Sequence, residues 1–388
     1  MSKRHTLALV LMAAGQSSRF SKTLPVHQRI KKQWIRINDI PLWKKVLEDL
    51  KTIYPFDEVI ITADEMDQHY MQHFCDSDEK IILGGETRSQ SLRNAIKHTN
   101  CDYVFVTDVA RCNFDQQVYA NLLKNFENYD CSAPFLSCPD TAIYQNSAIN
   151  RDELKLIQTP QISKTKLLEK FLLQRDYTDE SSAMIANQAN VRFLEGSYVM
   201  RKITFLEDLK QIIHFDSPSQ RTFTGNGIDI HAFEKTKKMY LGGVLLETDF
   251  GFKAHSDGDV LIHAIIDALL GAIGAGDIGE WFPDNDPSYH QINSSLLLEK
   301  IYSFIVSVGF EIHHIDVTIL TETPKISPYK QKIKRYLSSL LHISEYHINI
   351  KATTGEKMGF IGRSEGTCVF VTANLAYIDW KKLLRGEK

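Results

Sequence analysis

Three side chains in the second half of the chain have the chemical types and the spacing of a metal site. Asp229 and His231 are two residues apart in an apolar run, so on a β-strand both side chains would leave the same face. His263 follows an oxygen-rich helix start at 256–259 and lies in an apolar-periodic run at 260–273. One carboxylate and two imidazoles suit zinc, and three protein ligands leave a fourth position open, as in catalytic zinc sites. Taken alone, Asp-x-His could also be a polar pair at a sheet edge, because so short a motif often matches by chance.

A second set of candidate site residues follows strand-like segments in the first half of the chain. Ala13-Ala14-Gly15 comes directly after an apolar run, and small residues there let backbone N–H groups approach a phosphate while Arg19 adds positive charge. Two further segments, 84–91 and 108–111, open a helix and close a strand. Each segment alone could be a turn or a local ion pair. The chain has neither a Walker lysine nor a G-x-G-x-x-G motif, which argues against ordinary phosphate-loop and dinucleotide sites.

The elements that must position this second set alternate regularly. The patterns predict strands at 7–12, 58–63, 80–83, 103–107 and 132–135, and helices at 41–54, 65–74, 89–97 and 116–128. Repeated βα units predict a parallel sheet with helices on both faces, and ligands bind such a sheet outside the carboxyl ends of its strands. The candidate residues follow strands, so we expect them to meet at one edge.

Length and composition limit the remaining possibilities. A chain of 388 residues exceeds the size at which a single core stops growing, about 250–300 residues, and a polar stretch at 215–221 predicts a linker between domains 1–214 and 222–388. The net charge of −3 gives no overall basic field, so we expect no nucleic-acid partner. We expect no signal peptide and no membrane span. The cysteines show neither metal nor disulfide spacing, which favours the cytoplasm.

Three further motifs accompany the Asp229 group. They are His-Ser-Asp-Gly-Asp at 255–259, Gly-Asp-Ile-Gly-Glu-Trp-Phe-Pro-Asp at 276–284 and Lys-Ala-Thr-Thr-Gly-Glu-Lys at 351–357. With them, residues 222–378 resemble the 2-C-methyl-D-erythritol 2,4-cyclodiphosphate synthases. The resemblance implies a homotrimer whose active sites lie between adjacent subunits.

The same resemblance implies roles for individual residues. Asp229, His231 and His263 would hold zinc or another divalent transition metal, and His255 and Thr354 would stabilise the transition state. Glu356 would hold Mg²⁺ between the two phosphates of the substrate diphosphate. The implied substrate contacts are Ser256, Asp277, Ile278, Gly279, Phe282, Asp284, Pro324, Lys325, Thr353, Phe360 and Arg363.

The first half carries a comparable series of motifs. Ala-Ala-Gly-x-x-x-Arg at 13–19, Gly-Gly-x-x-Arg-x-x-Ser at 84–91 and Asp-x-Ala-Arg at 108–111 are joined by Lys-Gln-Trp at 32–34, Thr-Pro-Gln at 159–161 and Thr-Asp-Glu at 178–180. Residues 6–214 thereby resemble the 2-C-methyl-D-erythritol 4-phosphate cytidylyltransferases. The whole chain resembles the fused bifunctional enzymes of the non-mevalonate isoprenoid route. These resemblances imply a Rossmann-like nucleotidyltransferase domain with a mostly parallel sheet, followed by an α/β domain that trimerises.

This second resemblance also implies residue roles. Arg19 and Lys32 would stabilise the pentacoordinate phosphorus, while Arg151 and Lys202 would position the attacking phosphate. The nucleotide contacts would be Ala13, Ala14, Gly15, Gly85, Glu86 and Ser91. The other substrate, 2-C-methyl-D-erythritol 4-phosphate, would contact Asp108, Arg111, Thr141 and Thr159. Asp108 could also hold Mg²⁺ near the triphosphate of CTP.

Three positions depart from the family pattern. The family's Pro-Lys-Gln is replaced by Ile30-Lys-Lys-Gln33, so Lys22 or Lys31 could replace Lys32 as the catalytic lysine. Cys112 stands at a usual proline, and Glu86 at a frequent aspartate.

Two alternatives remain open at this point. One half could have lost catalysis and serve as a cytidine-nucleotide scaffold, or a nucleotidyltransferase could be fused to an unrelated metallohydrolase. The non-mevalonate route also needs a phosphorylation by ATP between the two implied reactions. This step has no visible site in the chain, which suggests a functional link to a separate kinase.

Overall fold

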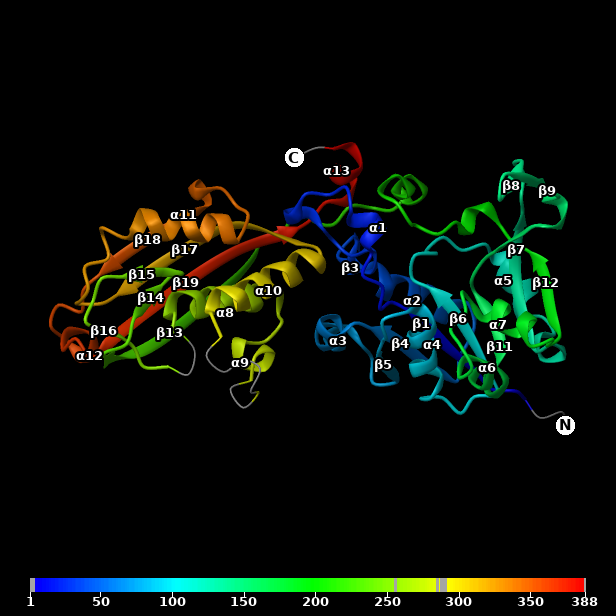
Figure 1. The fold of residues 1–388 in the computed structure, drawn as a ribbon, viewed down its shortest axis with the longest axis horizontal. Helices are drawn as coiled ribbons and strands as arrows, with labels where there is room; N and C mark the ends of the chain where they lie inside the picture. Colours follow the sequence, from blue (N-terminus) through cyan, green and yellow to red (C-terminus); the bar gives the residue numbers. More distant parts are fainter. Residues whose placement is uncertain (1–3, 255–256, 284–285, 287–291, 387–388) are drawn as a thin grey trace. The chain divides into compact units, whose positions relative to one another are not determined.

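The computed structural model describes residues 4–254, 257–283, 286 and 292–386. They form two compact units, and each is described here by itself (Figure 1). Unit 1 comprises Met1–Thr23, Lys31–Pro218 and Asp379–Lys388, and unit 2 comprises Leu24–Ile30 and Ser219–Ile378. Two segments, Leu24–Ile30 and Asp379–Lys388, are thus grouped differently from the expected boundaries at 1–214 and 222–388. The residues of the C-terminal segment have partners in unit 1, where the buried Trp380 donates from Nε1 to the Arg36 carbonyl at 2.9 Å.

Unit 1 is built on a mixed sheet with parallel strands at its centre. Its order is β10 (Lys155–Ile157), β7 (Cys131–Ser137), β11 (Gln161–Lys164), β6 (Tyr103–Asp108), β1 (Leu7–Met12), β4 (Glu58–Ala63) and β5 (Glu79–Leu83), with β12 (Val191–Glu195) also paired to β7. Strands β6, β1, β4 and β5 are mutually parallel, as the βα pattern predicted, whereas β11 runs antiparallel to β6 and β7. A separate hairpin, β8 (Ala142–Tyr144) with β9 (Ser147–Ile149), was not predicted.

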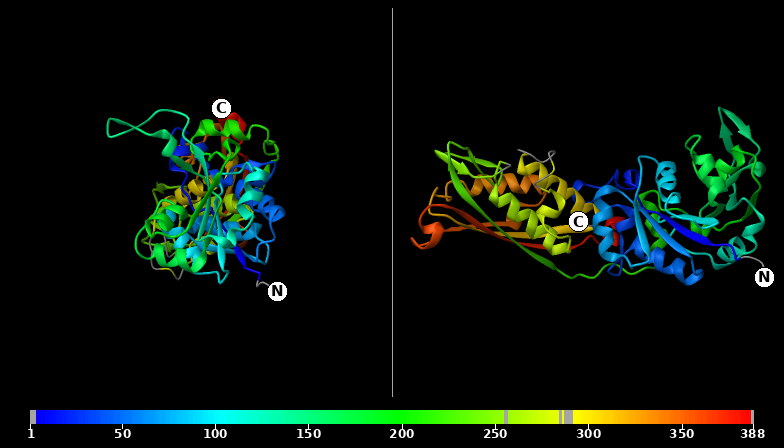
Figure 2. Two further views of the ribbon diagram at one scale, coloured as in Figure 1. Left: turned by 90° about the vertical axis from the view of Figure 1, so that its right-hand side faces the viewer. Right: turned by 90° about the horizontal axis from the view of Figure 1, so that it is seen from below.

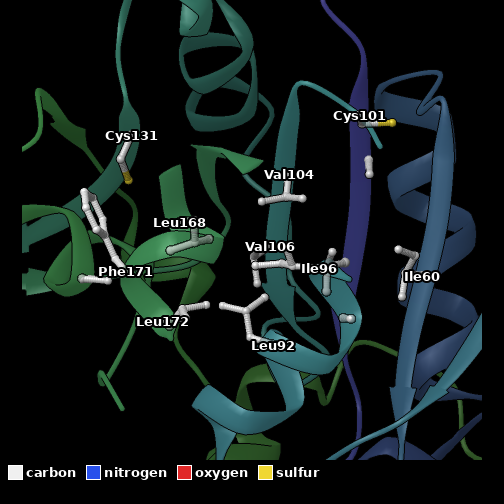
Figure 3. Close-up of a cluster of buried hydrophobic side chains, with 14 of the residues drawn as sticks. Ile60, Leu92, Ile96, Cys101, Val104, Val106, Cys131, Leu168, Phe171 and Leu172 are labelled. Carbon is white, nitrogen blue, oxygen red and sulfur yellow. The ribbon is translucent and has the colours of Figure 1, made fainter. Parts of the chain in front are cut away.

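Helices cover this sheet and bury its apolar side chains. They are α2 (Leu42–Ile53), α3 (Glu65–Met71), α4 (Arg88–Ile96), α5 (Gln116–Leu123), α6 (Thr165–Leu172) and α7 (Glu180–Ala186). Figure 3 shows part of the core, which Val104 and Val106 of β6 share with Leu92 of α4 and Leu168 of α6. A capping box of Thr87 and Gln90 fixes the start of α4, so α4 begins directly after the glycine turn that follows β5.

Unit 2 has a sheet of order β16 (Phe250–Phe252), β13 (Phe223–Lys235), β19 (Gly366–Tyr377), β17 (Phe310–Leu320) and β18 (Ile348–Thr353). Helix α8 (Val260–Ile273) packs on β13 and β19, while α10 (Ser294–Ser307) and α11 (Lys330–Leu340) pack on β17 and β18. These helices lie on one side of the strands of unit 2 (Figure 2). Close packing of α8 requires glycine on β13, because a Cβ at Gly227 would lie 1.9 Å from the Ala264 carbonyl oxygen.

The opposite face of this sheet is open. Side chains alternate along β13, so the neighbours of Gly227 point away from α8. On the open face, Ile228 and Ile230 of β13 are 55% and 54% exposed, and Phe370 of β19 is 42% exposed. The face therefore exposes apolar side chains that a solvated antiparallel sheet would normally replace with polar ones.

Among the described residues, none of the helices combines the length and the apolar character needed to cross a bilayer.

Two candidate active sites

A cavity of about 620 Å³ lies beyond the carboxyl ends of β1, β4, β5 and β6 in unit 1. This is the sheet edge at which the sequence predicted a ligand site. The predicted residues that line the cavity are Ala13, Ala14, Gly15, Arg19, Lys32, Gly85, Glu86, Ser91, Asp108 and Lys202. The structure therefore brings together most of the predicted site of the first half.

The glycine-rich turns at the cavity are held by hydrogen bonds to neighbouring strands and helices. Ala13 N donates to Thr62 Oγ1 at 3.0 Å, and Gly85 N donates to Ser91 Oγ at 3.0 Å. A Cβ at Gly15 would meet nothing within 4 Å, so packing does not require a glycine there. The missing side chain instead leaves the backbone of the loop accessible from the cavity, as close approach by a phosphate requires.

The three candidate lysines have different surroundings. Lys31 is committed to an ion pair with Asp64 and Asp67, the latter at 2.9 Å, and Lys22 is exposed and lies outside the cavity lining. Lys32 lines the cavity and donates from Nζ to the Ile203 carbonyl at 3.0 Å. The geometry therefore favours Lys32 over the two alternatives.

The surroundings of Lys32 also change its pKa. Burial lowers the pKa of Lys32 to about 8, and the positive charges of Lys202 and Arg19 contribute to this shift. These three cationic side chains repel each other, because the ion pair of Lys202 with Asp108 offsets only part of their charge. A bound polyphosphate would relieve that repulsion, so the cluster is suited to phosphate groups.

Asp108 is held between two cations at the floor of the cavity. Its Oδ1 accepts from Arg88 Nε at 3.1 Å, and its Oδ2 accepts from Lys202 Nζ at 2.9 Å. Burial alone would raise the pKa of Asp108, but Arg88 and Lys202 more than offset burial and hold the pKa below its usual range. Asp108 is therefore a permanent anion that fixes Lys202.

The remaining predicted residues of the first half lie outside the cavity lining. Arg111 donates to the Met200 carbonyl at 2.6 Å, and Thr159 Oγ1 accepts from Asp108 N at 3.4 Å, so both support the residues around the site. Thr141 and Arg151 are exposed beside the β8–β9 hairpin, where Arg151 donates to the Pro139 carbonyl at 2.7 Å. The structure does not bring these two residues to the cavity of their own chain.

In unit 2, Asp229 and His231 of β13 meet His263 of α8. One ligand atom from each side chain lies within 4.8 Å of the other two, and Asp229 Oδ2 is 3.1 Å from His231 Nδ1 and 3.2 Å from His263 Nδ1. Burial would raise the pKa of Asp229, but the two imidazoles lower it below its usual range. For His263, burial would lower the pKa, but the hydrogen bond and negative charge of Asp229 more than offset burial and hold the pKa above its usual value.

The surroundings of this group fit a divalent metal. Among the described residues, the buried His231 Nδ1 makes no hydrogen bond of good geometry, although it lies close to Asp229, as expected for two atoms aimed at a common third atom. His263 Nε2 lies 3.0 Å from Ser294 Oγ, which itself donates to Asp257. Such an outer hydrogen bond orients a metal-binding imidazole. The donor set of two nitrogens and one carboxylate is one that zinc accepts.

The start of α8 is fixed by Asp259, which places His263 one turn later. The buried Asp259 carboxylate accepts from Gly242 N at 2.8 Å, from Gly243 N at 2.6 Å and from Ile262 N at 3.1 Å. The oxygen-rich helix start predicted the cap at Ile262 N. The sequence did not indicate that Gly242 and Gly243 would also donate to Asp259.

The loop after β18 contains two other predicted residues, Thr354 and Glu356. Thr354 Oγ1 donates to Glu356 Oε1 at 2.7 Å, and Glu322, which follows β17, accepts from Gly355 N at 3.1 Å and from Lys357 N at 3.2 Å. Glu322 was not among the predicted residues, although it lies two positions before Pro324. Thr353 ends β18 next to this loop.

The other predicted substrate contacts of unit 2 differ in exposure. Asp277 caps the short helix α9 (Ile278–Trp281) by accepting from Gly279 N at 2.9 Å, while Phe282 is buried. Phe360 is partly exposed, and Arg363 pairs with Glu365 at 2.8 Å. His255, Ser256 and Asp284 lie outside the described residues.

A cavity suited to phosphates in one α/β unit and an Asp-His-His group in another are the features of an α/β enzyme with two separate sites. Residues 7–213 match the family model of 2-C-methyl-D-erythritol 4-phosphate cytidylyltransferase (IspD), and residues 222–376 match the YgbB family. The chain is 47% identical to the bifunctional enzyme IspD/IspF of Aliarcobacter butzleri, over 97% of this chain and 99% of that protein. The corresponding protein of Sulfurimonas denitrificans is 44% identical over 98% of this chain and 96% of its own length.

A solved structure gives the same result. The bifunctional IspDF of Campylobacter jejuni is 41% identical, with a TM-score of 0.82 over 97% of this chain and 100% of that chain. The chain belongs to the bifunctional IspD/IspF family. It joins a cytidylyltransferase and a cyclodiphosphate synthase in one polypeptide, which confirms the two predicted α/β domains and the enzyme class, while the trimer stays a prediction.

Proposed function

We propose that the two units catalyse two separate steps of the non-mevalonate isoprenoid route. Unit 1 transfers CMP from CTP to 2-C-methyl-D-erythritol 4-phosphate and releases diphosphate. Unit 2 converts 4-diphosphocytidyl-2-C-methyl-D-erythritol 2-phosphate to 2-C-methyl-D-erythritol 2,4-cyclodiphosphate and CMP. The observation that supports this most is that each unit has its own convergent group of candidate catalytic side chains. For that reason we do not favour an inactive half or an unrelated metallohydrolase.

In cytidylyl transfer, the substrate phosphate attacks the α-phosphorus of CTP, so two anions must be brought together in line. Arg19 and Lys32 neutralise charge that develops on the pentacoordinate phosphorus, because both lie at the cavity where the loop backbone is open. Lys202, fixed by Asp108, binds the attacking phosphate. The nucleotide is bound by Ala13, Ala14, Gly15, Gly85, Glu86 and Ser91.

Arg151 and Thr141 do not line the cavity of their own chain. We retain the proposal that Arg151 helps to position the attacking phosphate, together with Thr141, Thr159 and Arg111 around the second substrate. Arg151 and Thr141 flank an exposed hairpin, so their contribution requires the hairpin to reach a cavity other than the described one, such as that of a second copy.

In cyclisation, the nucleophile is the 2-phosphate of the substrate, so unit 2 needs no activated side chain of its own. Asp229, His231 and His263 would hold a divalent transition metal, with zinc the proposed ion, and this metal would supply Lewis-acid polarisation of a phosphate oxygen. Thr354 and His255 would donate to the charge that develops in the transition state. Glu356 offers a carboxylate oxygen for Mg²⁺ beside the substrate diphosphate.

Unit 2 is proposed to form a homotrimer. The support in this chain is the open sheet face with Ile228, Ile230 and Phe370, since contiguous exposed apolar side chains mark an interaction surface. Pro324, Lys325 and Thr353 would then contribute to a cytidine site shared between subunits, and Asp277–Gly279, Phe282, Asp284, Phe360 and Arg363 would contact the remaining substrate groups. We place the enzyme in the cytoplasm, with a functional link to the kinase that acts between the two steps.

Two incubations of the purified chain test the proposed function. CTP with methylerythritol phosphate and Mg²⁺ should yield diphosphate and the cytidyl product, and the doubly phosphorylated cytidyl substrate should yield CMP and the cyclic diphosphate. Inorganic phosphate from the second substrate, in place of the cyclic product, would instead identify a metallohydrolase.

A further inference from the structure

A series of buried and partly buried ion pairs extends from helix α7 to the cavity of unit 1. It starts at Glu180, the first residue of α7, whose side chain is fully buried. Glu180 Oε1 accepts from Arg88 Nη1 at 2.8 Å. Within the described part of the chain, Glu180 Oε2 has no hydrogen-bond partner. The buried carboxylate therefore depends on Arg88 for compensation of its charge.

Arg88 extends this series of ion pairs toward the cavity. It is the first residue of α4, and its Nε donates to Asp108 Oδ1 at 3.1 Å, while Lys202 Nζ donates to Asp108 Oδ2 at 2.9 Å. One guanidinium thus bridges two carboxylates, and one carboxylate bridges two cations. Glu180 itself does not line the cavity, whereas Arg88, Asp108 and Lys202 do.

The order of charges explains how Glu180 influences the position of Lys202, a side chain that it does not contact. Glu180 Oε1 accepts from Nη1 and so holds the guanidinium toward α7, while Nε donates to Asp108. Without the Glu180 carboxylate, Asp108 is the described carboxylate left to compensate Arg88, and the guanidinium is free to turn and compete with Lys202. An unpaired buried charge is costly, which gives this rearrangement a strong driving force.

We propose that Glu180 is a positioning residue for cytidylyl transfer, which fixes Lys202 at the cavity through Arg88 and Asp108. This inference rests on the proposed transfer reaction and adds a role for Glu180, the last residue of the Thr-Asp-Glu motif at 178–180. The motif otherwise has a plain structural role, because Asp179 caps α7 by accepting from Ser182 N at 2.7 Å.

The primary test is Glu180→Gln, which keeps the size of the side chain and removes its charge. We expect kcat/KM for methylerythritol phosphate to fall about tenfold to a hundredfold, the usual effect of losing an outer partner of a site residue. The Kd of CTP should stay within about twofold, because the 13–15 loop and the 85–91 turn that would bind the nucleotide are held by hydrogen bonds that do not involve Glu180. Cyclisation by the same sample should be unchanged. Glu169→Gln is the matched control: it is the same substitution on α6, which packs against α7, and it removes only a surface pair with Lys166 at 3.1 Å.

A double-mutant cycle distinguishes positioning from a general loss of packing. In a Lys202→Ala background, Glu180→Gln should change the transfer rate by less than about twofold, since coupled residues are not additive. An equal loss in both backgrounds, or a loss accompanied by weaker CTP binding, would overturn the proposal. If Glu180→Gln does not fold, Arg88→Lys decides, because a lysine keeps the positive charge but cannot bridge both carboxylates, and it should give the same coupled loss.

Different outcomes test the proposed transfer reaction and the role of Glu180. A wild-type chain without transfer activity overturns the proposed reaction of unit 1 and this inference with it. A wild-type chain that transfers CMP, with Glu180→Gln equally active, overturns only the role of Glu180.

Discussion

The charge on Lys32 gives the most direct prediction about cytidylyl transfer. Lys32→Ala removes a cation from the cavity where negative charge develops, and a lost transition-state donor of this kind costs about 3 kcal/mol, or about a hundredfold in kcat. Lys22→Ala is the matched control, because Lys22 is an exposed lysine of the same loop outside the cavity lining. Its transfer rate should stay close to that of the wild type.

The same residue predicts a pH dependence with a definite sign. The pKa of Lys32 is lowered to about 8, so the side chain is cationic below this pH and neutral above it. Because kcat/KM reports ionisations of the free enzyme, it should fall as the pH rises through about 8. Substrate phosphates ionise at lower pH, about 6, and therefore do not produce this decline. Bound anions stabilise the cation, so the decline in kcat should lie at higher pH.

The assay is diphosphate release from CTP between pH 7 and 10, with each substrate varied in turn. Lys32→Arg should be less active than the wild type at pH 7 but should lose the decline near pH 8, because arginine stays charged. A wild-type kcat/KM that is flat from pH 7 to 9.5 would refute the reasoning. So would a Lys22→Ala variant that loses activity while Lys32→Ala retains it.

Three other predictions concern unit 2. Asp229→Asn removes the only negative charge of the proposed metal group, so purified protein should lose most of its bound zinc by elemental analysis while transfer stays within about twofold. Gly227→Ala should destabilise unit 2 by about 3 kcal/mol or more in urea unfolding, because the added Cβ would lie 1.9 Å from a backbone oxygen of α8; near-wild-type stability would show that α8 can move. Ile230→Asp places a charge on the open sheet face and should convert a trimer to a smaller species in light scattering, and a wild-type monomer with full cyclase activity would contradict the trimer.

Local patterns predicted the parts of the fold that depend on local physics. The strands at 7–12 and 58–63 and the helix at 41–54 were predicted within one residue at each end, because their apolar periodicity is strong and their ends carry turn residues. The antiparallel strand β11 and the hairpin β8–β9 were missed. Strand β11 has only four residues, and the hairpin side chains are mostly exposed, so neither leaves a clear apolar pattern.

The candidate sites divide in the same way. The Asp229 and His231 pair could be predicted because two residues of one strand share a face, and His263 because a helix start precedes it. The pairing of Arg88 with Glu180 could not be predicted, since the two residues are 92 positions apart and meet only through the packing of α4 and α7 around the sheet. The sequence also did not reveal that Lys31 is committed to Asp64 and Asp67, which is what separates it from Lys32.

Paired rate measurements on one chain test most directly the claim that two complete and separate sites share this polypeptide. Transfer and cyclisation are measured on the wild type, Lys32→Ala and Asp229→Ala, with circular dichroism to confirm folding. We predict that the wild type catalyses both reactions, that Lys32→Ala loses transfer about a hundredfold and keeps cyclisation, and that Asp229→Ala loses cyclisation and keeps transfer within about twofold. A folded Asp229→Ala variant that loses both activities to the same extent would contradict this account.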